Sequence, residues 1–298
     1  MPRPLLALDA PSMYFRAFFG VPDTVTAPDG TPVNAVRGFL DMVSTLIKTR
    51  RPDRVVSALD YDWRPAWRVE LVPSYKTHRV ADPAENEEEV PDFLSPQVPI
   101  LIDVLAAAGI PSIGAAGFEA DDVLGTLAAV SDPPVEVVTG DRDLFQLITD
   151  DVKVLYVGRG VSKLEVMDDA AVRSRYGVPA AAYADFAVLR GDPSDGLPGV
   201  AGVGEKTAAR LLTAYGDLQS LLAAAHEQAP GLRAKLLAAA DYLAVAPQVV
   251  AVSRTVDLPE YDAGLPREPA EPDRLAMLAE RWGLKSPVDR LLSVMATR

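Results

Sequence analysis

The sequence lacks cysteine and has only two histidines, His78 and His226, among its 298 residues. The absence of cysteine excludes disulfide bonds and thiolate metal sites, and two isolated histidines do not predict a zinc centre or a histidine general base. No apolar run approaches the roughly 20 residues of a membrane-spanning helix, and the run before Asp9 is too short for a signal peptide. We therefore expect a cytoplasmic globular protein without a membrane partner.

Several aspartates and glutamates stand at the ends of apolar segments, where a charged side chain is expected to lie close to the protein interior. Three short apolar runs, residues 5–9, 55–60 and 135–141, are typical of buried strands, and each ends in aspartate. Carboxyl ends of neighbouring parallel strands meet at one rim of a sheet, where α/β proteins bind ligands. Clustered carboxylates repel one another unless a divalent cation neutralises them. The sequence thus predicts a Mg²⁺ or Mn²⁺ site, for which the nine candidate ligands are Asp9, Asp60, Glu119, Asp121, Asp122, Asp141, Asp143, Asp192 and Asp195.

Each of these acids also has a local explanation. Aspartate is a favoured helix N-cap, which suits Asp9, and it is common in turns, which suits Asp60 and the segment GDPSDGLPG. The helix dipole favours acids in a first helical turn, which suits residues 119–122. These explanations stay open for each acid alone, but their joint occurrence favours the metal site.

The net charge of −13 argues at first against a nucleic-acid partner. Setting the nine clustered acids aside leaves 33 of the 42 acidic residues against 29 basic ones, a balance of −4. A nucleic-acid enzyme needs local basic surface rather than a basic chain. The charge therefore does not exclude DNA.

The chain divides into two predicted domains. Residues 1–165 alternate strand and helix patterns, which predicts a Rossmann-like α/β core with a mainly parallel sheet. Residues 61–96 interrupt that alternation with five prolines and dense charge, too long for an ordinary connection and typical of a functional insert. Residues 166–298 carry helical patterns that end at glycines, which predicts a helical module.

The insert alternates basic and aromatic residues, a composition that suits a nucleic-acid single strand through phosphate contacts and base stacking. Its acidic stretch at 85–89 is expected to be a solvated face, and an exposed loop without function remains an alternative. The basic residues are Arg64, Arg68, Lys76 and Arg79, and the aromatic ones are Trp63, Trp67 and Tyr75.

The segment LPGVAGVGEKTAARLL, residues 197–212, is rich in glycine but matches neither the phosphate-binding P-loop nor the dinucleotide fingerprint. Its helical context favours a helix–hairpin–helix, in which backbone amides and a helix N-terminus hold a DNA phosphate. A plain helix connection is the alternative. The DNA-binding residues predicted here are Gly199, Gly202, Gly204, Lys206, Thr207 and Arg210.

Six motifs between about residues 5 and 212 occur in the order of one known family: LALDAPSMYFRAF, SALDYD, ELVPSYKTHR, GFEADDVLGTLA, VVTGDRDLFQL and LRGDPSDGLPGVAGVGEKTAARLL. With them the chain resembles the 5′-nuclease superfamily, most closely the bacterial and phage 5′–3′ exonucleases and flap endonucleases, including the 5′-nuclease domain of DNA polymerase I. The resemblance implies a PIN-like nuclease core, a helical arch formed by the insert at 61–96, and a helix–two-turn–helix DNA-binding module.

The resemblance also assigns roles to residues. All nine acids match the metal site of the family, and we expect Asp9, Glu119, Asp121, Asp122 and Asp141 or Asp143 as inner ligands, with Asp60, Asp192 and Asp195 acting through water. It further implies that Arg16 is the basic residue near the first acid, and that Lys76 and Arg79 contact the scissile phosphate. Gly196 stands where the family often has asparagine.

The expected activity is hydrolysis of DNA phosphodiester bonds at a 5′ end or 5′ flap, with two or more Mg²⁺ or Mn²⁺ ions and a K⁺ ion at the hairpin of residues 199–204. We expect a monomer, associated with the nucleoid through DNA, with a DNA polymerase or sliding clamp as partner. Two alternatives are a PIN-type ribonuclease that cuts single-stranded RNA and a noncatalytic protein that binds DNA structures.

Overall fold

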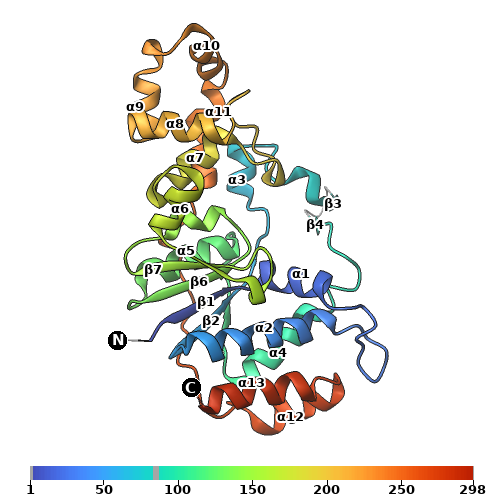
Figure 1. Cartoon of the computed structure of the whole chain (residues 1–298). Helices are drawn as coiled ribbons and strands as arrows, with labels where there is room; N and C mark the ends of the chain where they lie inside the picture. The colour runs from blue at the N-terminus through green and yellow to red at the C-terminus, as the bar shows by residue number, and fades with distance from the viewer. Residues whose placement is uncertain (1–2, 83–86, 298) are drawn as a thin grey trace.

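The computed structural model describes residues 3–82 and 87–297. Its centre is a six-stranded sheet in the order β5-β2-β1-β6-β7-β8, parallel except for β8, which pairs antiparallel with β7 (Figure 1). The strands are β1 (Leu5–Asp9), β2 (Arg54–Ala58), β5 (Ser112–Ile113), β6 (Val135–Thr139), β7 (Val152–Tyr156) and β8 (Glu165–Met167). The predicted parallel α/β core is confirmed, and the antiparallel edge strand β8 was not anticipated.

Both faces of the sheet are buried, which explains why the strands are continuously apolar. In β1, Leu5 and Ala7 face one hydrophobic cluster, while Leu6 and Leu8 face another. The first cluster includes α5 (Ala120–Val130) and helices of the helical module, and the second includes α1 (Ala10–Gly20), α2 (Asn34–Arg50) and α4 (Gln97–Ala108). The sheet is therefore the middle layer of a three-layer sandwich (Figure 1).

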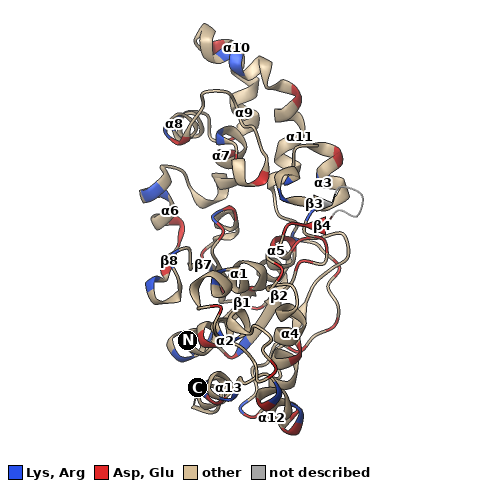
Figure 2. Cartoon of the chain, turned by 90° about the vertical axis from the view of Figure 1, so that its right-hand side faces the viewer, with Lys and Arg blue, Asp and Glu red and all other residues tan. Residues whose placement is uncertain are grey.

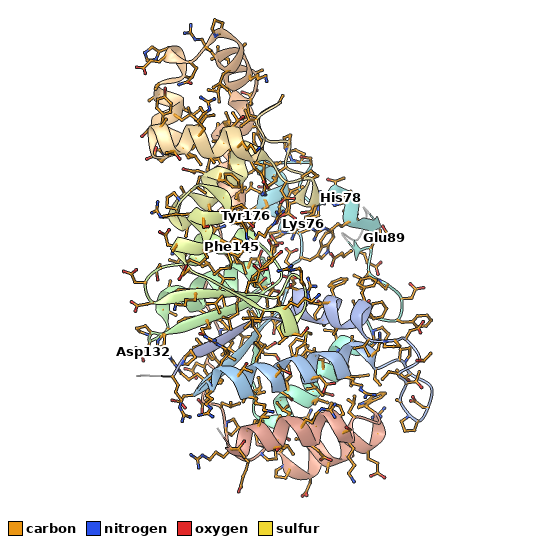
Figure 3. All side chains as sticks on the ribbon, in the orientation of Figure 1. Lys76, His78, Glu89, Asp132, Phe145 and Tyr176 are labelled. Atoms are coloured by element: carbon orange, nitrogen blue, oxygen red, sulfur yellow. The ribbon has the colours of Figure 1, made fainter. Side chains whose placement is uncertain are left out.

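The helical module stands on the first face of the sheet. Aromatic rings join the two parts: the ring centroid of Phe145 lies 5.3 Å from that of Tyr183 and 5.9 Å from that of Tyr176 (Figure 3 labels Phe145 and Tyr176). Aromatic contacts of this kind add to the stabilisation from buried area. The module comprises α6 (Asp169–Tyr176), α7 (Tyr183–Arg190), α8 (Glu205–Tyr215), α9 (Leu218–Ala223), α10 (Pro230–Ala238) and α11 (Ala240–Val250), with short 3-10 turns η4 (Ala180–Ala182), η5 (Pro193–Asp195) and η6 (Ala225–Glu227).

The last part of the predicted module of residues 166–298 packs against the core rather than against the other helices of the module. After α11 the chain leaves the module, passes along α5 and reaches the β2 edge, where the Leu265 amide donates to Asp53 O. Helices α12 (Pro272–Arg281) and α13 (Lys285–Thr297) then pack beneath α2 and α4 (Figure 1). They do so because one stripe of each helix is apolar and joins the second cluster, together with Leu284 of the connection between them: Leu275, Leu278, Val288, Leu291 and Met295.

The insert is only partly helical in its described residues. It contains α3 (Ala66–Leu71), the 3-10 turn η1 (Thr77–Arg79), and an antiparallel pair of short strands, β3 (Val80–Asp82) and β4 (Glu87–Glu88). Helix α3 packs against α11, so the base of the insert contacts the helical module. The insert therefore lies over the carboxyl rim of the sheet (Figure 1).

Candidate active site

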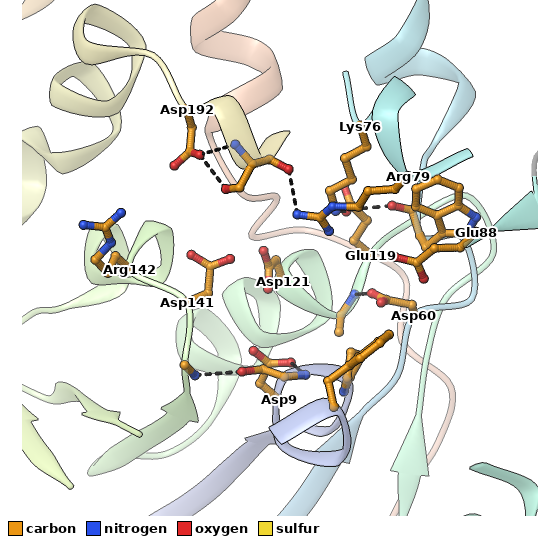
Figure 4. Close-up of a pocket in the computed structure, with 17 residues that line it drawn as sticks. Asp9, Asp60, Lys76, Arg79, Glu88, Glu119, Asp121, Asp141, Arg142 and Asp192 are labelled. Carbon is orange, nitrogen blue, oxygen red and sulfur yellow. Dashed lines mark hydrogen bonds and ion pairs between the residues drawn. The ribbon is translucent and has the colours of Figure 1, made fainter. Parts of the chain in front are cut away.

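A cavity of about 330 Å³ opens at the carboxyl rim, between the sheet, the insert and the loop that carries Asp192 (Figure 4). Strands β1 and β6 end beneath it, and α5 begins at its side (Figure 2 shows Asp and Glu positions on the loops around α5 and β4). Six of the nine predicted ligands line the cavity: Asp9, Asp60, Glu119, Asp121, Asp141 and Asp192. The convergence that the strand ends predicted is thus present.

Asp9 ends β1 and is buried, with 3% of its surface exposed. Its Oδ1 accepts from the Ser12 amide at 3.1 Å, which makes it the N-cap of α1, and its Oδ2 accepts from the Thr139 hydroxyl at 2.5 Å. Burial, together with repulsion from Asp60 and Asp141, raises the pKa of Asp9 to about 7 despite these hydrogen bonds. Asp9 is therefore both the N-cap of α1 and one of the acids that line the cavity.

The neighbouring acids are electrostatically strained in the same way. Asp60 accepts from the Ala120 amide at 2.7 Å at the start of α5, and burial with repulsion from Glu119 raises its pKa to about 6. Burial and the charges of Asp141 and Asp9 raise the pKa of Asp121 well above its usual value. A cation in the cavity would relieve both the lost solvation and the mutual repulsion.

These residues fit a hard divalent cation, because the cavity offers carboxylate oxygens and no sulfur or imidazole. Within residues 3–82 and 87–297, no three acidic or histidine side chains stand close enough to form a complete cage. That is compatible with Mg²⁺, which keeps several waters and commonly takes one or two carboxylates plus substrate phosphates. The rim is therefore a site that a hydrated ion and a phosphate would complete together.

Two further predicted ligands, Asp143 and Asp195, lie beside the cavity rather than in its wall. Burial and the charges of Asp141, Asp195 and Asp192 raise the pKa of Asp143 well above its usual value. Burial raises the pKa of Asp195 to about 6, although Lys76 opposes the rise. The helical-module side of the rim is thus as crowded with charge as the sheet side.

The ninth predicted ligand, Asp122, does not line the cavity in this structure. It is fully buried, its two oxygens accept from the Arg68 guanidinium at 2.7 and 2.8 Å, and Oδ1 also accepts from the Ser253 amide at 2.8 Å. Adjacent residues of an α-helix point about 100° apart. Asp121 therefore faces the rim while Asp122 faces away.

Arg68, which was predicted to contact DNA, is buried in this structure, with only 2% of its surface exposed. Arg64 lies partly buried within the insert, where its Nε donates to Tyr75 O at 2.7 Å and an Nη to Thr77 Oγ1 at 3.1 Å. Basic residues alternating with aromatics thus stabilise the base of the insert here. The side chains of Arg64 and Arg68 form hydrogen bonds within the protein.

Two of the predicted phosphate-binding residues do line the cavity. Lys76 forms an ion pair with Glu119 and donates to Trp63 O at 3.3 Å. Burial alone would lower the pKa of Lys76, but the charges of Glu119 and other acids raise it well above its usual value. Arg79 donates to Ser194 O at 2.7 Å (Figure 4), and it also pairs with Asp195 at 3.2 Å.

Arg16 lies outside this cavity, in a neighbouring hollow that it shares with Arg159. Its guanidinium is close to Gly140, since a Cβ built on that glycine would lie 3.0 Å from Arg16 Nη2. The Arg16 Nε is buried without a hydrogen-bond partner in the described structure. The structure therefore places Arg16 next to the loop of Asp141 but not among the acids.

The glycine hairpin begins beside the loop that carries Asp192. Gly199 has φ +64°, and a Cβ there would lie 2.5 Å from Gly191 N, so the two backbones meet too closely for any side chain. Gly204 is the N-cap residue of α8 and supplies no side chain to its amides. Gly202, Gly204, Lys206 and Arg210 are exposed, while Thr207 is half-buried.

Several cavity residues were missed from the sequence. Glu88 belongs to the acidic stretch expected as a solvated face, but it lines the cavity, and burial raises its pKa. Glu85 of that stretch lies outside the described residues. Arg142 also lines the cavity, beside Trp63 of the insert, and Thr139 orients Asp9. The sequence could have indicated Thr139, because it stands at the end of an expected strand, two positions before the candidate ligand Asp141.

An acid-lined rim of a parallel sheet, flanked by Lys76 and Arg79, is the arrangement of a metal-dependent phosphodiesterase. Family models make the class specific: "5′-3′ exonuclease, N-terminal resolvase-like domain" matches residues 4–177, and "5′-3′ exonuclease, C-terminal SAM fold" matches residues 178–273. The chain belongs to the 5′-3′ exonuclease family, and it is a DNA nuclease of the hydrolase class.

The chain is 55% identical to a 5′-3′ exonuclease of Streptomyces coelicolor, over 97% of this chain and 99% of that one. It is 53% identical to a 5′-3′ exonuclease of Mycobacterium tuberculosis, over 100% and 99%. A DNA polymerase I of M. tuberculosis is 43% identical over a region that covers 73% of this chain and 24% of the polymerase. Among solved structures, the T5 5′-exonuclease with bound zinc has a TM-score of 0.67, 16% identity and 99% coverage of both chains, which confirms the fold.

Proposed function

We propose that the protein is a structure-specific 5′-nuclease that hydrolyses a DNA phosphodiester bond near a 5′ end or at the base of a 5′ flap. The observation that carries the proposal is the position of one loop, residues 191–199. It brings Asp192 to the acid cavity and packs through Gly199 against Gly191 at the start of the glycine hairpin. In this proposal, the loop of residues 191–199 connects the segment that would bind the duplex with the cavity in which the bond would be cut.

In the proposed reaction, water attacks the phosphorus and the bond to the 3′-oxygen breaks, which leaves a 5′-phosphate and a 3′-hydroxyl after proton transfer. Divalent cations, when bound, supply Lewis-acid stabilisation of the phosphate charge and a more acidic water. Asp9, Glu119, Asp121 and Asp141 would hold them, with Asp60 acting through water. Lys76 and Arg79 are placed to neutralise the phosphate, and exposed Lys206 and Arg210 to contact the duplex backbone without reading bases.

The proposal also covers the identity and the number of the metal ions. We infer Mg²⁺ or Mn²⁺ as the physiological ion and at least two ions per site, because acids crowd both the sheet side and the module side of the rim. K⁺ at the hairpin, a monomeric state, nucleoid association in the cytoplasm, and a polymerase or clamp partner stay predictions. In the described residues no helix is both long and apolar enough to cross a bilayer.

The test uses a 5′-labelled flap DNA, the same flap in RNA, and Mg²⁺ or Mn²⁺. Asp141→Asn should reduce flap cleavage at least about a thousandfold, since a lost ion forfeits several kcal/mol of transition-state stabilisation. Binding of the flap should change little. Asp150→Asn, an exposed acid away from the cavity, is the matched control. Near-normal cleavage by Asp141→Asn, or cleavage of RNA alone, would contradict the proposal.

A further inference from the structure

A buried ion cluster adjoins the cavity through Glu119, and two of its members, Arg68 and Asp122, have no role in the proposed reaction. At its centre is Arg68, which extends from α3 at the base of the insert. The guanidinium donates both Nη groups to Asp122, at 2.7 and 2.8 Å, and Nη1 donates to Glu119 Oε2 at 2.5 Å. It also lies 4.4 Å from the ring centroid of Trp67. A guanidinium is rarely buried to this extent unless it is paired, and removal of one partner would leave the other charge buried without compensation.

The cluster fixes one carboxylate of the cavity. Glu119 Oε2 accepts from Arg68 and from the Tyr75 hydroxyl at 2.7 Å, while Oε1 pairs with Lys76. Because Oε2 is held by two buried donors, rotation of the carboxyl group is prevented, and Oε1 stays directed toward the cavity that Glu119 lines. The planar fork of arginine, unlike lysine, can hold two carboxylates in one fixed geometry.

The same guanidinium also reaches the helical module. Arg68 Nε donates to Val249 O, one residue before α11 ends, at 3.0 Å. The chain then turns so that the Ser253 amide donates to Asp122. One side chain therefore joins three segments: the insert, the start of α5 with its acids, and the exit from the module. The two acids of the cluster, Glu119 and Asp122, are balanced by Arg68 and Lys76.

We propose that Arg68 is a positioning residue for the metal site: it holds Glu119 in the orientation that binds a divalent cation, with Asp122 as its anchor rather than as a ligand. This inference rests on the proposed function for its consequence in DNA cleavage, but not for its consequence in metal affinity. Groups that orient a metal ligand typically contribute 10–100-fold to metal affinity.

The experiment compares Arg68→Gln and Arg68→Lys with Arg50→Gln. Arg50 makes a matched ion pair with the buried Glu136 in the amino-terminal half of β6, far from the cavity rim. Mn²⁺ binding to the DNA-free protein is measured by electron paramagnetic resonance, and thermal melting is measured in EDTA. Both Gln variants should melt earlier. Only Arg68→Gln should bind Mn²⁺ at least about tenfold more weakly, with Arg68→Lys in between.

A double variant keeps the proposal testable if Arg68→Gln folds poorly. Arg68→Gln with Asp122→Asn replaces the buried charges by a neutral amide pair, so it should bind Mn²⁺ more tightly than Arg68→Gln alone. Equal Mn²⁺ affinity in Arg68→Gln and Arg50→Gln would overturn the proposal, as would a double variant no better than Arg68→Gln. Failure of wild-type protein to cut flap DNA would refute the proposed function but leave these Mn²⁺ measurements as a valid test.

Discussion

Replacing Asp9 by asparagine should stabilise the metal-free protein while removing its activity. The pKa of Asp9 is raised from 3.8 to about 7, chiefly by burial. Because the folded-state pKa lies above that of the unfolded chain, ionisation of Asp9 favours unfolding. Its contribution to stability is fully present below about pH 4 and is lost as the pH rises to about 7.

The magnitude follows from the same values. Each pH unit corresponds to about 1.4 kcal/mol, so an ionised Asp9 costs the folded protein about 4 kcal/mol above pH 7. Asparagine removes that charge but disturbs the hydrogen bond from Thr139, which costs about 1 kcal/mol. The net gain of about 3 kcal/mol should raise the melting temperature by about 6 °C for a chain of this size.

Melting is measured in EDTA between pH 5 and 8, with Asp150→Asn as the exposed control. We expect the wild-type melting temperature to fall across this range, and the difference between Asp9→Asn and wild type to grow with pH. Added Mg²⁺ should raise the melting temperature of wild type, since it binds the folded state, and should have little effect on Asp9→Asn. An Asp9→Asn protein that melts at or below wild type at pH 8 would refute the assignment of repulsion and lost solvation to this carboxylate.

Two further substitutions test the DNA-docking surface and the packing of the returning chain. Lys206→Ala should weaken duplex binding several-fold and reduce the slope of log affinity against log salt by about 1, whereas the exposed Lys163→Ala should not; an unchanged slope would remove the hairpin from the interface. Gly125→Ala would place a Cβ well inside van der Waals contact with Ser253 O and should destabilise by about 1–3 kcal/mol in urea melts, while Gly231→Ala, where a Cβ meets open space, should not. Equal stability of these two glycine variants would show that the chain near Ser253 can shift freely.

The gathering of acids at the rim could be predicted, because it depends only on which residues follow each strand in the sequence. Strands that end in Asp9 and just before Asp60 and Asp141 must bring those acids to one edge once they pair in parallel. Which acid of a helical turn faces the rim depends on rotation about the helix axis. Asp121 and Asp122 differ by one position, and only tertiary packing of α5 decides between them.

Contacts between segments far apart in sequence could not be predicted. Arg68 has the composition of a nucleic-acid contact, and nothing local indicates that Asp122, Glu119 and Val249 O surround it. Likewise, the apolar stripe of α13 is compatible with packing on any apolar surface, and it packs on α2. Such partners depend on the complete fold, because burial of one stripe requires a second surface of matching shape.

The helical module is fastened to the core at both ends: it enters after β8 and leaves through the segment near Ser253, which packs along α5 and continues to the β2 edge. A segment held at two points cannot swing as an appended domain on one linker could. Attachment at both ends restricts the movement of the hairpin relative to the cavity. With the proposed contact between the hairpin and a duplex, the protein would act as a ruler, placing its cut at a constant number of base pairs from that contact.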